Sequence, residues 1–331
     1  MSRGVLGLAA AAGVDFPHIA VAQERTRKGL EERSRRLSSL DLSPSTGDAS
    51  VVLTGSWGRH EATRDSDDDF IVLFELAPPE NADAVVQGVH DALGGGHVGE
   101  EGVFGRHASL SDLLGKIGRD EDSNTNLTRR MLLILESVPV AGEVVHLRAR
   151  RSLLAGYLDA HMKDYRPPRF LLNDLVRYWR TIAVDFESKM RARQGDGWGL
   201  RNAKLRLSRK ALFAGGLLPV LECYRYGAES MLEHLDGRMS VPPLDRLADA
   251  FRDHDALDPG VRALGAYDAF LEVLNDPDKR ALLSALTHDQ RHDSELFQRI
   301  TELGQEFEAG LLALLFDDAQ LRRWVREYLI F

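Results

Sequence analysis

Two short apolar runs, residues 51–54 and 70–74, constrain the fold of this chain more than any other feature of its sequence. Both runs are rich in β-branched, aliphatic or aromatic side chains, and each is bounded by turn-forming or acidic residues, so they predict two buried β-strands. The segment that joins them begins with Gly55-Ser56 and ends in a cluster of aspartates. We therefore expect a glycine turn and an acidic group to lie opposite each other.

The rest of the chain is predicted to be mostly helical. We expect an amphipathic helix over 18–40, a loop over 41–50, helices over 82–93 and 127–137, and a further strand near 103–108. From residue 147 onward, apolar residues recur at helical spacing and we expect no strand. The sequence thus predicts a helical segment over 1–45, a small α/β (α+β) domain with a mixed sheet over 46–150, and an all-helical domain over 151–331.

Composition excludes several classes of protein. The 331 residues are 44% hydrophobic and carry 51 acidic and 42 basic side chains, which gives a net charge of −9. This acidic balance argues against a long nucleic acid as partner, and no apolar run reaches the ~18 residues that a membrane span needs, so we expect neither. The start, residues 1–12, is short and rich in Ala and Gly, and we do not expect it to be a signal peptide. A single cysteine, Cys223, fits a cytoplasmic protein.

The segment between the two predicted strands carries residues suited to phosphate chemistry. A strand that ends in Gly55 and Ser56 exposes backbone N–H groups and a hydroxyl, which can hold phosphate oxygens. Asp67 and Asp69 are two residues apart, so both carboxylates lie on one face of an extended chain and can bind the same divalent ions. Such ions neutralise the phosphates of a nucleoside triphosphate and lower the pKa of an attacking hydroxyl.

Gly55-Ser56, followed at this distance by Ser66-Asp67-x-Asp69 and an apolar strand, resembles the signature of the DNA polymerase beta-type nucleotidyltransferase superfamily. Within it the window is most similar to the bacterial uridylyltransferase and adenylyltransferase branch. The resemblance is sharp over about 20 residues and looser over 45–150. It implies a nucleotidyltransferase fold for 46–150, a phosphate-loop role for Gly55 and Ser56, and Mg²⁺ or Mn²⁺ ligation by Asp67 and Asp69.

Two departures from the family pattern matter. The position between the aspartates is usually apolar, but here it is Asp68, so Asp65 with Asp67 is an alternative register. We keep Asp67 and Asp69 because the strand then continues directly from Phe70. A third carboxylate, which many members carry on a later strand, has no clear counterpart; Glu100, Glu101 and Glu136 are weak candidates.

Further basic and hydroxyl side chains could complete a phosphate site. Arg201, Lys204 and Ser208 share a face of a predicted helix, and the family often supplies a lysine and a serine from its helical domain, which implies Lys204 and Ser208 as nucleotide-binding residues. The alternative is a solvated basic face. Arg59 is close enough in sequence to assist with phosphate charge. Arg129 and Arg130 could line a cleft or form buried ion pairs.

These features together predict a magnesium-dependent, ATP- or other NTP-binding nucleotidyltransferase of the cytoplasm. The resemblance implies transfer of an NMP from an NTP donor to an acceptor hydroxyl, with Asp67 and Asp69 as catalytic residues and pyrophosphate as the second product. A protein side chain or a small molecule is the first choice of acceptor, and an RNA end or an aminoglycoside is the alternative. A catalytically impaired nucleotide-binding or scaffold protein is the competing hypothesis.

Overall fold

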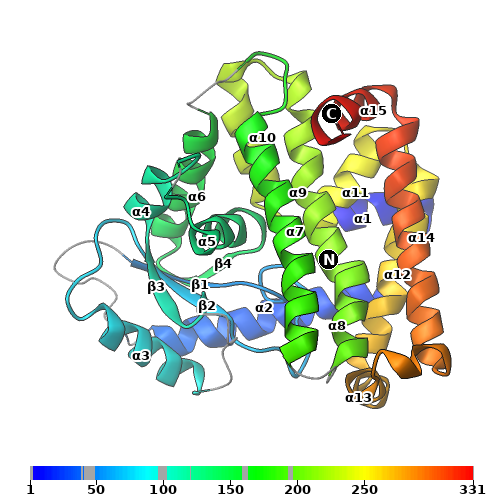
Figure 1. Cartoon of the computed structure of the whole chain (residues 1–331), viewed down its shortest axis with the longest axis horizontal. Helices are drawn as coiled ribbons and strands as arrows, with labels where there is room; N and C mark the ends of the chain where they lie inside the picture. The colour runs from blue at the N-terminus through cyan, green and yellow to red at the C-terminus, as the bar shows by residue number, and fades with distance from the viewer. Residues whose placement is uncertain are drawn as a thin grey trace. The chain divides into compact units, whose positions relative to one another are not determined.

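The computed structural model describes residues 3–38, 40, 49–95, 103–119, 121–158, 163–192 and 197–330. The chain forms two compact units, each assembled from separate segments (Figure 1). The helical unit comprises Met1–Gln23, Leu175–Tyr224 and Pro243–Phe331, and the sheet unit comprises Glu24–Asp174 and Arg225–Pro242. The expected division at residues 45 and 150 stays a prediction.

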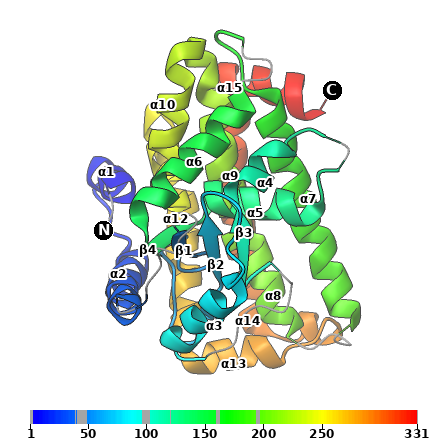
Figure 2. The same cartoon turned by 90° about the vertical axis from the view of Figure 1, so that its left-hand side faces the viewer.

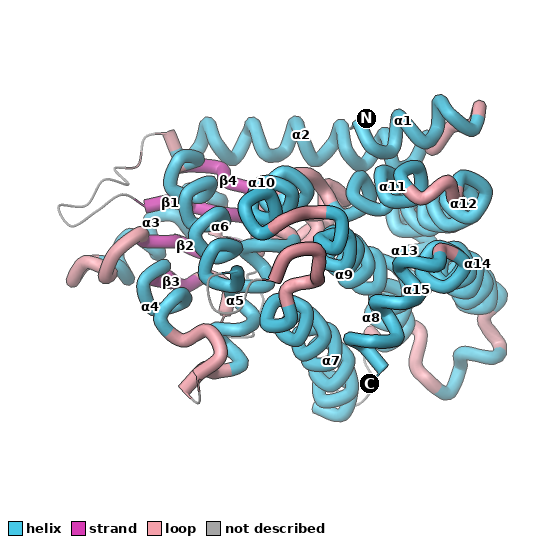
Figure 3. Tube along the Cα trace, turned by 90° about the horizontal axis from the view of Figure 1, so that it is seen from above, coloured by secondary structure: helices cyan, strands magenta, loops and turns pink. Residues whose placement is uncertain are grey.

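A mixed four-stranded sheet lies at the centre of the sheet unit, so this part has an α+β architecture. The strands are β1 (Ala49–Leu53), β2 (Phe70–Phe74), β3 (Arg106–Ser109) and β4 (Val138–Ala141). Their order is β3-β2-β1-β4, which Figure 3 shows in magenta. β1 is antiparallel to both β2 and β4, whereas β2 and β3 are parallel. A mixed sheet was expected from the sequence, and this part of the fold is confirmed.

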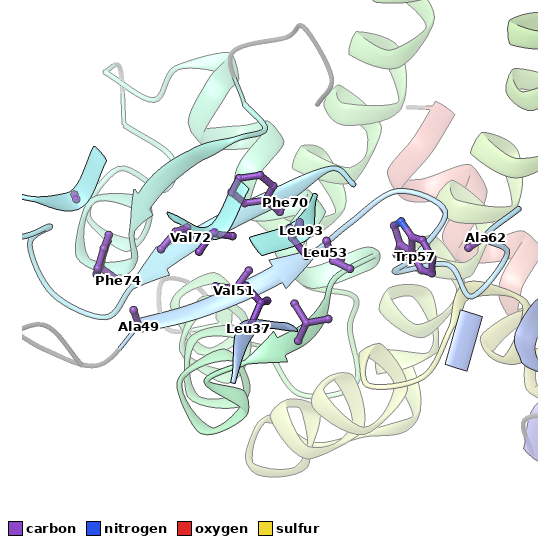
Figure 4. Packing of buried hydrophobic residues seen from close by; sticks show 13 residues of the cluster. Leu37, Ala49, Val51, Leu53, Trp57, Ala62, Phe70, Val72, Phe74 and Leu93 are labelled. Atoms are coloured by element: carbon purple, nitrogen blue, oxygen red, sulfur yellow. The ribbon is translucent and has the colours of Figure 1, made fainter. Parts of the chain in front are cut away.

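Helices cover both faces of this sheet, which explains why β1 and β2 are apolar along their whole length. On one face, alternate residues of β1 and β2 pack with α2 (Pro17–Leu37) and α3 (Ala82–Leu93) in a single apolar cluster (Figure 4). The opposite face is covered by α4 (Leu110–Gly115), α5 (Asn124–Leu135) and α6 (Glu143–Leu158). Figure 2 shows the strands side by side with α3 near one end of the sheet. Helix α10 (Ala228–Met239) packs against α6.

The helical unit contains no strand among its described residues, as expected. Its helices are α1 (Arg3–Ala12), α8 (Trp198–Lys204), α9 (Lys210–Glu222), α11 (Pro243–Asp253), α12 (Leu257–Asn275), α13 (Pro277–Ala285), α14 (Glu295–Asp317) and α15 (Ala319–Val325). Helix α7 (Arg169–Ala192) begins in the sheet unit and ends in this one. No helix of the described chain is both long and apolar enough to cross a membrane.

A π-helical turn before α9 and strand β4 depart from a plain α-helical or loop expectation. A π-helical turn, Leu205–Arg209, joins α8 to α9. Strand β4 follows α5 directly and contains Pro139, which lacks an N–H group and is tolerated because β4 is an outer strand of the sheet. The sequence did not indicate β4, because the proline in a four-residue run favours a turn.

A buried charge network joins α5, α6 and the first turns of α7. Arg130 of α5 is fully buried, and its guanidinium donates to Asp122 Oδ1 at 2.8 Å and to Asp174 Oδ2 at 3.1 Å. Its Nε donates to the hydroxyl of Tyr157 at 2.8 Å, and that hydroxyl donates to Asp174 Oδ2 at 2.7 Å. Burial and the Asp174 carboxylate raise the pKa of Tyr157. Of the two alternatives for Arg130, a cleft-lining residue or a buried ion pair, the structure shows the buried ion pair.

Removing Arg130 is therefore expected to destabilise the sheet unit strongly. Arg130→Met leaves the carboxylates of Asp122 and Asp174 buried without their cation, which costs about 3–5 kcal/mol of unfolding free energy. Urea unfolding, monitored by circular dichroism, measures this loss of unfolding free energy. Arg151→Met is the matched control, since the Arg151–Glu233 pair is exposed and such pairs contribute little to stability. Equal losses in the two variants would contradict the assigned role of the network.

Candidate functional site

The pairing of β1 with β2 brings the glycine turn and the aspartates together at one end of the two strands. Leu53 lies opposite Phe70, and the next residue, Thr54, donates its backbone N–H to the carbonyl of Asp69 at 2.9 Å. The Thr54 hydroxyl donates to the same carbonyl at 3.1 Å. As a result, Oδ2 of Asp69 lies only 3.3 Å from the point where a Cβ on Gly55 would be. Glycine thus leaves open the space beside this carboxylate.

The loop after β1 is a compact turn closed by backbone hydrogen bonds. Gly55 has a φ of +64°, which glycine adopts without strain. The amides of Arg59, His60 and Glu61 donate to the carbonyls of Gly55, Trp57 and Ser56, so the chain turns back on itself. These bonds do not use the amides at positions 56–58, at the start of the turn. Successive backbone N–H groups of this kind form binding sites for phosphate oxygens.

Hydroxyl groups fix the two ends of the loop to each other. Ser56 donates its hydroxyl to Ser66 Oγ at 3.0 Å, and the same Oγ accepts the backbone N–H of Thr63 at 2.8 Å. The indole Nε1 of Trp57 donates to the carbonyl of Asp67 at 3.0 Å. The start of the turn and the aspartate segment are therefore one connected structure.

Asp68 accounts for the departure from the usual apolar position between the two acids. Its carboxylate accepts from Arg33 Nε at 2.8 Å, and the Arg33 guanidinium lies 3.8 Å from the centre of the Trp57 ring. Asp68 thus points toward α2, on the side where Phe70 joins the apolar cluster. Because side chains alternate along an extended chain, Asp67 and Asp69 point to the opposite side. This arrangement agrees with Asp67 and Asp69 as the pair of carboxylates.

These two carboxylates fit a hard divalent cation, although the described residues supply no third acid. Asp67 is exposed and Asp69 is half-buried. Within the described ranges, no three His, Cys, Asp or Glu side chains gather as a metal site. Mg²⁺ commonly takes only one or two carboxylates and completes its shell with water and substrate phosphates. Glu100 and Glu101 lie outside the described residues.

Glu136 and Arg59 have structural partners. The Arg59 guanidinium is buried, with Nε donating to Glu61 Oε1 at 2.6 Å and Nη1 donating to Glu136 Oε2. Both candidates are thereby engaged in one ion-pair cluster that anchors the loop to the end of α5. The expected phosphate contact of Arg59 stays a prediction, and this buried pairing argues against it. The same pairing argues against Glu136 as the third carboxylate.

Lys204 and Ser208 belong to the helical unit, whereas the residues described above belong to the sheet unit. The π-helical turn begins directly after Lys204, so it interrupts the α-helical spacing that was expected to put both residues on one face. Ser208 is buried, and its Oγ accepts from the Tyr267 hydroxyl at 3.3 Å, which favours a core role. A contact of Lys204 with a phosphate tail stays a prediction.

Sequence reasoning missed the residues that hold the loop in place, chiefly Arg33, Trp57 and Glu61. One signal could have indicated Arg33, because a charged Asp68 in a position that faces the apolar side requires a cation opposite it. Comparisons with known proteins add no assignment: the chain matches no protein-family model, and no curated protein is significantly similar to it.

The loop tolerates no side chain at Gly58. A Cβ there would lie 1.7 Å from the carbonyl oxygen of Glu136, so the backbone would have to move. We expect Gly58→Ala to lower the unfolding free energy by about 3 kcal/mol, the upper end of overpacking costs. Gly237→Ala on α10 is the control, since no atom lies within 4 Å of its added Cβ, and it is expected to stabilise the helix by up to about 1 kcal/mol. Thermal and urea unfolding of both variants measure these changes. An unchanged unfolding free energy in Gly58→Ala would show that the loop backbone can move to accept a side chain.

The loop also makes stability depend on pH through His60. This residue has a φ of +57°, and burial lowers its pKa from 6.5 to about 4. The unfolded chain therefore binds a proton near pH 6.5 that the folded chain binds only near pH 4, so stability is complete above pH 6.5 and is lost as the pH falls toward 4. At 1.36 kcal/mol per pKa unit, the loss approaches about 3 kcal/mol.

His60→Asn tests this, because asparagine tolerates a positive φ and does not titrate. The unfolding free energy of wild type should fall more steeply between pH 6.5 and 4 than that of the variant. His146, whose pKa burial also lowers to about 4, contributes equally to both proteins. Parallel pH profiles would refute the effect of His60.

Proposed function

We propose that this protein is a metal-dependent nucleotidyltransferase that moves an NMP from an NTP to an acceptor hydroxyl. The observation that carries the proposal is the position of the Asp69 carboxylate beside Gly55, at the mouth of the turn. A phosphate chain held by the backbone amides of that turn would lie next to both aspartates. The motif spacing and the geometry of the loop support the same chemistry.

Each residue has a separate task in this proposal. Gly55 and Ser56 bind the β- and γ-phosphates through backbone N–H groups, and the Ser56 hydroxyl keeps the turn closed on Ser66. Asp67 and Asp69 would hold Mg²⁺ or Mn²⁺. When bound, the cation neutralises phosphate charge and favours the deprotonated acceptor. Asp68 and Arg33 position the two aspartates and do not contact substrate.

The reaction is an in-line displacement at the α-phosphorus. The acceptor oxygen forms a bond to this phosphorus, its proton leaves, and the bond to the bridging oxygen of pyrophosphate breaks. The acceptor is a protein side chain or a small molecule, and an RNA end or an aminoglycoside is the alternative. We place the reaction in the cytoplasm, where the buried thiol of Cys223 stays reduced.

A second candidate function is supported by one observation about β3. The residues of β3 that lie beside β2 include no acid: Gly105 donates its N–H to the Phe70 carbonyl at 2.8 Å, and Arg106 lies opposite Ile71. A nucleotide-binding protein without turnover, acting as a sensor or scaffold, would have the same loop and lack the third carboxylate.

Calorimetry with ATP, GTP, CTP and UTP tests the proposal. We expect at least one NTP to bind wild type only with Mg²⁺, and Asp67→Asn/Asp69→Asn to weaken binding at least tenfold, which corresponds to about 1.4 kcal/mol. Glu24→Gln/Glu31→Gln is the matched control, because it removes the same two negative charges from the exposed side of α2, within the same unit. It should bind the NTP as wild type does.

The outcomes separate the two candidate functions. Pyrophosphate release on addition of an acceptor supports the transferase. Metal-dependent NTP binding with no pyrophosphate release from any acceptor class supports the non-catalytic alternative. Failure of all four NTPs to bind, or equal loss in Glu24→Gln/Glu31→Gln, overturns the assignment of the site.

A further inference from the structure

An arginine of β3 lies on the same side of the sheet as Asp69. Arg106 is in register with Ile71, two residues beyond Asp69 on the neighbouring strand. The next residue, His107, faces α3, since its ring packs edge-on against Phe74 at 6.2 Å and its Nε2 is 3.6 Å from Asp83. Alternation along β3 therefore directs Arg106 to the opposite side. This is the side toward which Asp69 and Ile71 also point.

A second arginine, Arg129, belongs to α5, one of the helices that cover this side of the sheet, and has a buried donor without a partner. Arg129 is half-buried, and its Nε is buried with no hydrogen-bond partner in the described chain. Burial and the charge of Arg106 together lower the pKa of Arg129. The neighbouring Arg130 is different, since Asp122 and Asp174 compensate its charge. A buried donor left without a hydrogen bond loses its hydration and gains nothing in return, so the Arg129 site is unfavourable as it stands.

Two like charges and an unused donor together are typical of a site for a doubly charged oxyanion. Guanidinium groups bind phosphate through paired, charge-assisted hydrogen bonds, which are about twice as strong as neutral ones. A phosphate group between the two side chains would remove their repulsion and could accept the Nε proton. A carboxylate has half the charge and fewer acceptor oxygens, so it compensates the pair less well.

We propose that Arg106 and Arg129 form a binding site for a phosphate group. The site is on the face of the sheet that α4, α5 and α6 cover, which is the side toward which Asp69 points. The site is distinct from the Gly55 turn, and it goes beyond the proposed function because it needs no metal. The phosphate belongs either to the nucleotide or to a phosphorylated acceptor. In both cases the identity of the ligand rests on the proposed function, and the second case excludes a cationic aminoglycoside as acceptor.

Binding of inorganic phosphate and pyrophosphate, measured by calorimetry at constant ionic strength with EDTA present, tests the site. We expect Arg106→Gln and Arg129→Gln each to weaken binding at least tenfold, and Arg129→Lys to recover part of it. Arg151→Gln removes an equal charge from an exposed pair elsewhere in the same unit and should bind as wild type does. No binding to wild type, or equal binding by all variants, overturns the proposal.

Thermal unfolding provides a second readout, which does not require phosphate binding to produce a measurable heat. Without phosphate, Arg106→Gln should unfold at or above the wild-type temperature, because a repulsion is removed. Added phosphate should raise the unfolding temperature of wild type and leave that of Arg106→Gln almost unchanged. Equal phosphate-induced shifts in the two proteins would overturn the proposal.

Competition then identifies the source of the phosphate. Displacement of inorganic phosphate by the Mg²⁺–NTP complex assigns the site to the nucleotide, whereas simultaneous binding of both assigns it to a phosphorylated acceptor. Asp67→Asn/Asp69→Asn should keep metal-independent phosphate binding. Failure of the nucleotidyltransferase proposal is thus seen in NTP binding, and failure of the arginine site is seen in phosphate binding.

Discussion

The antiparallel pairing of β1 with β2 determines where every residue of the candidate site lies. With Leu53 opposite Phe70, the chain leaves β1 at the same end at which it enters β2. The segment between them must therefore close on itself over a short distance, which requires a glycine in the left-handed region and several internal hydrogen bonds. A shift of one residue in this register would turn Asp69 toward the apolar cluster and Asp68 away from Arg33.

Electrostatics then fixes the orientation of three consecutive acids. Three adjacent carboxylates repel one another, and the extended backbone separates them onto two sides of the sheet. The middle one is neutralised by Arg33, while Arg59 is held between Glu61 and Glu136 below the loop. Arg33 and Arg59 thus serve the structure of the loop, since each is paired with a carboxylate of the loop or of the residue after α5.

The elements that the sequence predicted well are those whose residues interact mainly with near neighbours. The amphipathic pattern of residues 82–93 predicted the bounds of α3, and the two apolar runs predicted β1 and β2. Short elements such as α4 and β4 were missed, because six or four residues show no clear period. In the site, the spacing within the loop indicated the aspartates and the glycine turn. The ion pairs Arg33–Asp68 and Arg59–Glu136 join residues 35 and 77 positions apart, and no local pattern can reveal such partners.

The two outer strands of the sheet are each only four residues long, and one of them carries Pro139. An edge strand normally exposes a row of N–H and C=O groups to which a strand of another molecule can pair. Short length and a missing N–H group reduce that row to a few positions. Assembly of copies of this chain into extended sheets, the usual hazard of a small open sheet, is therefore disfavoured by the backbone itself.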